Sequence, residues 1–235
     1  MKKSILFGAL VLMAGSLMAA DSSPKDDVTA AAKKLAGDSY SWKQTLDLGP
    51  NAPFTPGPTE GKTEKDGYTW LSSSFRDNTT IGLAREKKVV VKTDDGWKTA
   101  EEIGDGGGGF NANAYMARRL QNLKAPAADI QDLVSKTVEI KKDGDVYSGD
   151  LTEDGAKALL TAGFRRNNAN PPTNAKGSVK FWVKDGAITK YETKGTGKGQ
   201  FNGESMDIER TTTVEIKDVG KTKVEVPDDA RKKLS

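Results

Sequence analysis

Short runs of alternating apolar and polar residues, separated by turn signals, place the strongest constraint on the fold of this chain. The clearest run spans residues 179–184, and Asp185-Gly186 predicts a hairpin turn before residues 188–193 return. Residues 61–98 show the same pattern, with turns at Asp-Gly and Asp-Asn pairs. Because alternation leaves one apolar face, these runs predict an antiparallel sheet with one side buried.

Helical patterns interrupt the strands. A helix is predicted to begin at Ser23-Pro24, where a capping hydroxyl precedes a proline, and to end at Gly37. Two helices are expected in residues 111–135, another in 152–163, and a short one after Pro227. We therefore predict an α+β domain over residues 21–235, a curved antiparallel half-barrel whose concave face is covered by helices.

Several segments are predicted to connect these elements. The glycine-rich segment 104–109 is favoured as a flexible connector over a phosphate-binding loop, since no Lys-Ser or Lys-Thr follows it. Residues 167–176 are predicted to form an exposed loop, and residues 195–203 a turn region.

The first twenty residues are predicted to be a signal peptide. Lys2 and Lys3 precede an apolar run over residues 5–18, and Ala19-Ala20 follows it. An uncleaved anchor is the alternative, but the run is shorter than the ~20 residues that span a bilayer. With no cysteine for lipid attachment, we expect a periplasmic or secreted protein that is not lipid-anchored.

The composition excludes several functional classes. The chain has no cysteine and no histidine, which removes disulfides, the commonest general base and the commonest zinc ligand. Without Lys2 and Lys3 the formal charge falls from +3 to +1. Such a balance lacks the basic footprint of a nucleic-acid-binding protein. We expect no cofactor, no metal site, no nucleic-acid partner and no catalytic residue.

Acidic pairs and serines offer no site for catalysis. Asp94-Asp95, Glu101-Glu102 and Asp228-Asp229 are adjacent, so their side chains diverge on a strand or helix. The Asp143-Gly-Asp145 sequence lacks the ligand spacing of a calcium-binding EF-hand. Serine nucleophiles have no histidine partner.

Three segments carry a resemblance to a known group of proteins. They are DVYSGDL at 145–151, which leads into a helix, the hairpin GSVKFWVKDGAITKY at 177–191, and VEIKDVGKTKVEVP at 214–227. Together with the order of helix, strands, helical insert and strands, they resemble the periplasmic lipid-carrier half-barrels, namely the LolA lipoprotein carriers and the LppX/LprG lipid-carrier family. The resemblance implies a space for acyl chains between the sheet and the helices.

The apolar strand and helix faces are the candidate lining of that space. A filled core is the alternative, because both produce the same alternation. The candidate ligand-binding residues are Trp42, Leu46, Trp70, Phe75, Ile81, Leu83, Val89, Val91, Met116, Leu120, Phe181, Val214 and Ile216.

Two further features concern the surface. Trp182 lies between Lys180 and Lys184 on the face opposite Phe181, so it is a candidate contact for a membrane surface or a sugar, or else a covered aromatic. Arg118 and Arg119 are predicted to face solvent rather than to bind an anion, because adjacent residues diverge by about 100° on a helix.

Two functional hypotheses follow. The first is a monomeric carrier or binder of lipid or lipoprotein acyl chains that contacts membranes transiently. The second is an interaction or scaffold module of the cell envelope with a filled core and no small-molecule ligand.

Overall fold

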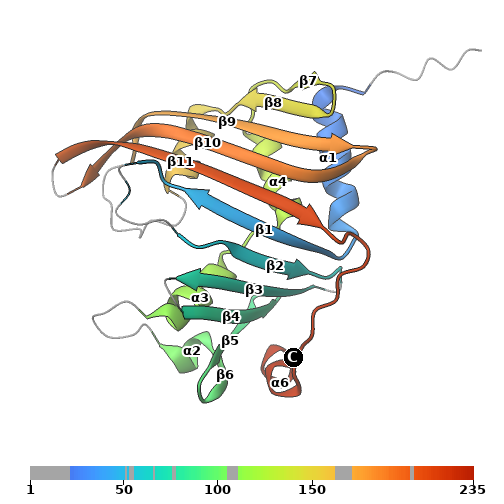
Figure 1. Ribbon diagram of the computed structural model, residues 1–235, viewed down its shortest axis with the longest axis vertical. Helices are drawn as coiled ribbons and strands as arrows, with labels where there is room; N and C mark the ends of the chain where they lie inside the picture. The colour runs from blue at the N-terminus through green and yellow to red at the C-terminus, as the bar shows by residue number, and fades with distance from the viewer. Residues whose placement is uncertain are drawn as a thin grey trace, which may run out of the picture.

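The strands of this protein form one antiparallel sheet in a computed structural model (Figure 1). The structure describes residues 22–50, 52, 56–65, 67–75, 78–104, 111–161, 171–201 and 204–235. The predicted signal peptide lies outside the described residues, as do residues 105–109 of the predicted connector. The sheet has eleven strands in the order β6-β5-β4-β3-β2-β1-β11-β10-β9-β8-β7. The prediction of a curved, antiparallel α+β half-barrel is confirmed.

The strand and helix boundaries follow the predicted sequence of elements. The strands are β1 (Tyr40–Asp47), β2 (Thr59–Thr63), β3 (Tyr68–Phe75), β4 (Asn78–Arg85), β5 (Lys88–Thr93), β6 (Gly96–Thr99), β7 (Lys141–Asp143), β8 (Val146–Asp150), β9 (Thr173–Lys184), β10 (Ala187–Phe201) and β11 (Glu204–Lys217). The helices are α1 (Pro24–Ala36), α2 (Ala100–Ile103), α3 (Ala112–Gln121), α4 (Pro126–Ser135), α5 (Glu153–Thr161) and α6 (Asp228–Leu234).

Two strands from opposite ends of the chain meet in the centre of the sheet. β1 pairs with β2 on one side and with β11 on the other, and Trp42 lies opposite Ile216. Both side chains are buried, at 4% and 6% exposure. A one-residue shift of this register would turn both toward the other face, so the burial of the pair specifies the register.

The main core lies on the face of the sheet that the helices cover. Met116 and Leu120 of α3 join one buried cluster with Val89 and Val91 of β5. In Figure 1, α1, α3 and α4 lie behind the strands on this same side. The sheet curves around these helices, so we call this the concave face.

The start of α1 forms as the sequence predicts. Ser23 caps the helix, because its hydroxyl accepts a hydrogen bond from the backbone N–H of Asp26 at 3.2 Å. The predicted apolar face is buried. It consists of Val28, Ala31, Ala32 and Leu35.

The C-terminal helix lies on the face of the sheet for which the sequence analysis predicted no helix. Ala230 and Leu234 of α6 pack in a separate cluster with Leu83 of β4 and Val90 of β5. Successive residues of a strand point to opposite faces, so α6 covers the convex face while α3 covers the concave face. The apolar positions of β4 and β5 are therefore buried on both sides.

Two segments predicted as loop or turn are strands. β10 continues through Gly195 and Gly197, and β9 begins at Thr173, inside the predicted loop 167–176. The glycines are needed because α5 crosses the strands here: a Cβ at Gly197 would lie 2.9 Å from Leu160 Cδ1. Glycine in this strand therefore marks the close approach of a helix rather than a turn.

Gly61 of β2 makes room for the central tryptophan. A Cβ at Gly61 would overlap the indole ring of Trp42, which also donates a hydrogen bond from Nε1 to Thr63 Oγ1 at 3.3 Å. We expect Gly61→Ala to lower the free energy of unfolding by about 1–3 kcal/mol, the range for overpacking a core. Urea denaturation measures this loss. Glu60→Ala, at an exposed neighbouring position, is the control, and equal stability of the two variants would contradict the packing role.

Candidate site between the sheet and the helices

The helices pack closely on the two ends of the concave face. α3 packs on β4 and β5, whereas α1 and α5 pack on β9 and β10, and α4 packs on α1. β1, β2 and β3 lie between the strands that these two helical groups cover, and Tyr40 of β1 contacts the start of α4. We call the concave face of β1, β2 and β3 the seam.

Most of the predicted lining residues belong to the concave core. These core residues are 0–6% exposed. They are Trp42, Val89, Val91, Met116, Leu120, Phe181, Val214 and Ile216. Leu46 is outside this cluster and is half-buried on β1, four positions beyond Trp42, so alternation places it on the concave face at the seam. A lining role for these residues stays a prediction.

Three other predicted residues lie on the convex side. Trp70 and Leu83 are opposite one another in the β3–β4 register and pack in the α6 cluster. Ile81 shares the face of Leu83 by alternation. The structure therefore does not bring these three to the space between sheet and concave-side helices. Sequence alternation alone does not reveal this, since either face of a doubly covered strand is apolar. The side chain of Phe75 lies outside the described residues.

Trp182 is half-buried on the convex face, opposite Lys190 of β10. The Lys190 ammonium lies 4.4 Å from the centroid of the Trp182 ring, a cation–π distance. The flanking lysine is therefore a cross-strand neighbour rather than the sequence neighbours Lys180 and Lys184. A surface-contact role for Trp182 stays a prediction.

Arg119 does not face solvent as the sequence analysis predicted. Arg118 is exposed, but Arg119 is half-buried and donates a hydrogen bond from Nη1 to the Ser73 hydroxyl of β3 at 3.1 Å. Burial lowers the pKa of Arg119. The prediction is wrong for Arg119 because α3 lies flat on β4 and β5, which directs position 119 sideways toward β3.

A second arginine enters the same region from the sheet. Arg210 of β11 is opposite Gly195 of β10 and is half-buried. Burial lowers the pKa of Arg210, and the like charge of Arg119 lowers it further, whereas Tyr115 and Asp129 act in the opposite direction.

A half-buried carboxylate, that of Asp129, fastens α4 to the sheet. The Tyr191 hydroxyl of β10 donates to Asp129 Oδ2 at 2.8 Å. Burial raises the pKa of Asp129, and burial together with the Asp129 charge raises the pKa of Tyr191 well above its ordinary value. Tyr40 holds the start of the same helix, because its hydroxyl accepts from Ala127 N at 3.3 Å. Sequence analysis missed this cluster, since no local motif links its members.

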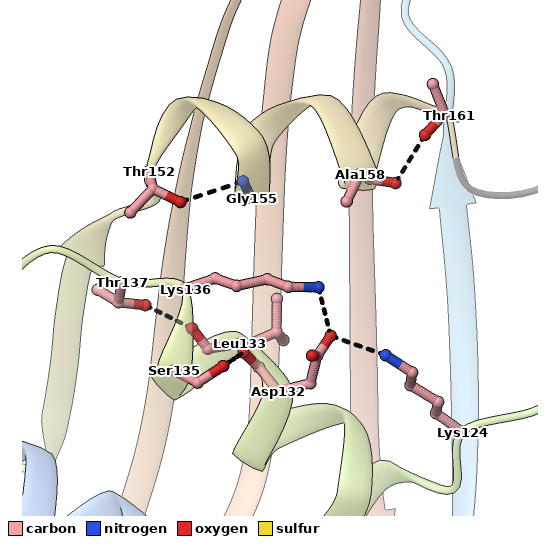
Figure 2. Close-up of polar contacts among 10 residues, drawn as sticks. All are labelled: Lys124, Asp132, Leu133, Ser135, Lys136, Thr137, Thr152, Gly155, Ala158 and Thr161. Atoms are coloured by element: carbon pink, nitrogen blue, oxygen red, sulfur yellow. Dashed lines mark hydrogen bonds and ion pairs between the residues drawn. The ribbon is translucent and has the colours of Figure 1, made fainter.

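On the outer side of α4, one carboxylate is paired with two lysines (Figure 2). Asp132 accepts from Lys124 and Lys136, each at 2.8 Å. Above it, Gly155 N donates to the Thr152 hydroxyl at 3.1 Å and begins α5. These charges also act on Asp129, because the two lysines lower its pKa and Asp132 raises it.

The described residues contain no group of three or more acidic side chains arranged to hold a metal ion. Within the same residues, no helix has both the length and the apolar character needed to cross a bilayer. The larger of two described surface depressions, about 390 Å³, lies at the far end of β9 to β11, beside Gly197 and Ile208.

Comparisons with known proteins identify similar solved structures only. No family model and no curated protein matches the chain. The Mycobacterium tuberculosis lipoprotein LppX is 8% identical with a TM-score of 0.47, over 87% of this chain and 98% of that one. LprF from Mycobacterium bovis is 10% identical with a TM-score of 0.44, over 87% and 96%. A LolA superfamily protein from Nitrosomonas europaea is 11% identical with a TM-score of 0.34, over 88% and 96%.

These structures include both groups that the sequence resembles, LolA and LppX. Every TM-score here is below 0.5, so the function has to be inferred from the residues of this chain.

The Asp129–Tyr191 pair predicts a defined stability change. Tyr191→Phe leaves the half-buried carboxylate without this donor, so we expect a loss of about 1–3 kcal/mol in the free energy of unfolding at pH 7. Chemical denaturation measures it. Thr189→Ala, at an exposed position of the same strand, is the control.

Asp129 also predicts a pH dependence. Its pKa is raised in the folded state, so the folded state binds the proton more tightly, and the contribution of Asp129 to stability falls as pH rises through that pKa. Asp129→Asn should therefore gain stability relative to the wild type as pH rises from about 4 to 7. Parallel thermal melts across this range measure the difference. A difference that stays constant with pH would contradict the raised pKa.

Proposed function

We propose that this protein is an exported, non-catalytic envelope protein that binds or carries an apolar ligand, such as lipid or lipoprotein acyl chains, between its sheet and helices. The observation that carries the proposal is the seam on the concave face. The helices pack most closely on the two ends of this face, and Leu46 is only half-buried at the boundary between them.

The seam has the chemistry that acyl chains require. Trp42 lies on the same strand as Leu46, and Met116 and Leu120 of α3 belong to the core that borders it. Each CH₂ group removed from water contributes about 0.8 kcal/mol. An acyl chain that separates α3 from α4 would therefore offset the cost of moving two short helices.

The ionisable groups near the seam are consistent with binding rather than catalysis. The Asp129 carboxylate is held by the Tyr191 hydroxyl. The chain supplies no histidine or cysteine, so a nucleophile would have no ordinary activating base. The predicted signal peptide supports a location of this binding activity in the periplasm or outside the cell.

A bulky substitution at the seam tests the location. We expect Leu46→Trp to reduce displacement of an apolar fluorescent dye by lipid several-fold, because the indole occupies the space of the ligand. Thr45→Trp, at the adjacent exposed position on the convex face, should bind normally. Thermal melts of both variants check that the fold is kept, and equal binding by both would place the ligand elsewhere.

Native mass spectrometry of protein purified from the cell envelope tests the function itself. The proposal expects co-purified lipid that delipidation removes and added lipid restores. Absence of lipid together with absence of dye displacement would overturn it. That result would favour an interaction module with a filled core, for which the tight burial of Phe181, Val214 and Ile216, at 0–6% exposure, is the supporting observation.

A further inference from the structure

The convex face of β9 carries a row of lysines and one tryptophan. Alternate residues of the strand share this face. They are Lys176, Ser178, Lys180, Trp182 and Lys184. The three lysines are exposed and Trp182 is half-buried, and β9 contains no acidic residue. The alternation of the strand therefore gathers its positive charges on one side of the sheet.

This row faces away from the helices that pack on β9. Val179, Phe181 and Val183 belong to the concave core with residues of α1, so the side chains between them point to the opposite face. In Figure 1, α1 and α4 lie behind β9 and β10. The convex-side helix, α6, packs on β4, β5 and β6 instead. The lysine row is therefore part of the outer surface.

Nearby carboxylates balance only part of this charge. Four lysines on this face form no ion pair with any residue that the structure describes. They are Lys176, Lys180 and Lys184 of β9 and Lys190 of β10. Glu192 of β10 lies opposite Lys180, and Asp150 of β8 lies opposite Ser178. Four lysines against two carboxylates leave an excess of two positive charges on this part of β8, β9 and β10.

Trp182 adds an aromatic ring to the charged face. Val146, half-buried on β8, lies opposite Trp182 on one side, and the Lys190 ammonium lies 4.4 Å from the ring centroid on the other. Tryptophan combines an apolar ring with one N–H donor and is enriched where membranes meet water. Lysine stems can lie along apolar surface while their ammonium groups reach outward. This combination suits the headgroup layer of a membrane.

The length of the row favours an extended partner. Lys176 and Lys184 are eight residues apart on one strand, which corresponds to about 26 Å at 3.3 Å per residue. A site for one small anion would bring its cations together at one point. A row of this length can instead contact several headgroups of a flat surface at once.

We propose that the convex face of β9 and β10 binds the surface of a membrane that contains anionic phospholipids. The contacting side chains are Lys176, Lys180, Lys184, Lys190 and Trp182. This contact goes beyond the proposed function, since it requires no ligand between sheet and helices. It would also leave the concave-side helices away from the membrane and free to separate.

Co-sedimentation of the mature protein with vesicles tests the contact. Vesicles of phosphatidylcholine alone are compared with vesicles that also contain phosphatidylglycerol, an anionic lipid. We expect at least tenfold stronger binding to the anionic vesicles at low salt. This binding should weaken as salt is added, because salt screens exposed charges.

Matched variants locate the contact on the protein. Lys180→Gln and Lys184→Gln should each lower binding to anionic vesicles about fivefold, the factor for one lysine near an anionic surface. Lys33→Gln is the control, because Lys33 is exposed on α1, on the other side of the sheet. It removes the same charge and should bind like the wild type. Thermal melts check that all three variants fold.

The tryptophan has a separate measurement. Its emission should change when anionic vesicles are added, because the ring enters the headgroup layer. Trp182→Phe should remove most of this change. An emission change that persists in Trp182→Phe would show that Trp182 is not in the contact.

The outcomes keep this proposal apart from the proposed function. Weaker vesicle binding in the two β9 variants but not in Lys33→Gln supports the membrane contact. An equal loss in all three overturns its location, and absence of binding to anionic vesicles overturns the membrane as partner. Binding to heparin alone would assign the surface to an acidic polysaccharide. Leu46→Trp, which blocks the seam, should still bind vesicles, so either proposal can fail without the other.

Discussion

The antiparallel pairing of β1 with β11 is the contact on which the rest of the structure depends. It joins a sheet half built from residues 40–99 to a half built from residues 141–217. The segment between the halves, which contains α3 and α4, therefore returns across the concave face. Trp42 and Ile216 secure this pairing in the core, and Gly61 makes room for the tryptophan ring.

This arrangement explains why two helical groups cover the concave face instead of one continuous layer. α3 follows β6 and α2 along the chain and packs on the first half, whereas α1 and α5 pack on the second. The strands at the junction of the halves lie between them. Polar side chains contribute contacts on this face as well, since Arg119 donates to Ser73 and Tyr191 donates to Asp129.

Some elements could be predicted from local sequence patterns, whereas the roles of particular glycines and apolar residues could not. The alternation in residues 179–193 predicted the β9–β10 hairpin, and the Ser23-Pro24 signal predicted the start of α1; both are confirmed. The prediction of a turn at Gly195 and Gly197 is wrong. A glycine beneath a crossing helix and a glycine in a turn cannot be told apart from the neighbouring sequence. Leu83 and Val91 are equally apolar, yet α6 covers one and α3 the other.

The sequence by itself determined the antiparallel α+β class, most helix and strand positions and the absence of histidine and cysteine chemistry, because these depend on local periodicity, turn residues and composition. Its signal peptide and ligand lining remain predictions. Only the tertiary structure decided that α6 covers the convex face, that Arg119 turns toward β3 and that Tyr191 holds Asp129 of α4. Those facts depend on which surfaces meet when distant segments of the chain pack together. The local pattern of a strand or helix shows that one face is apolar, but not which element covers that face.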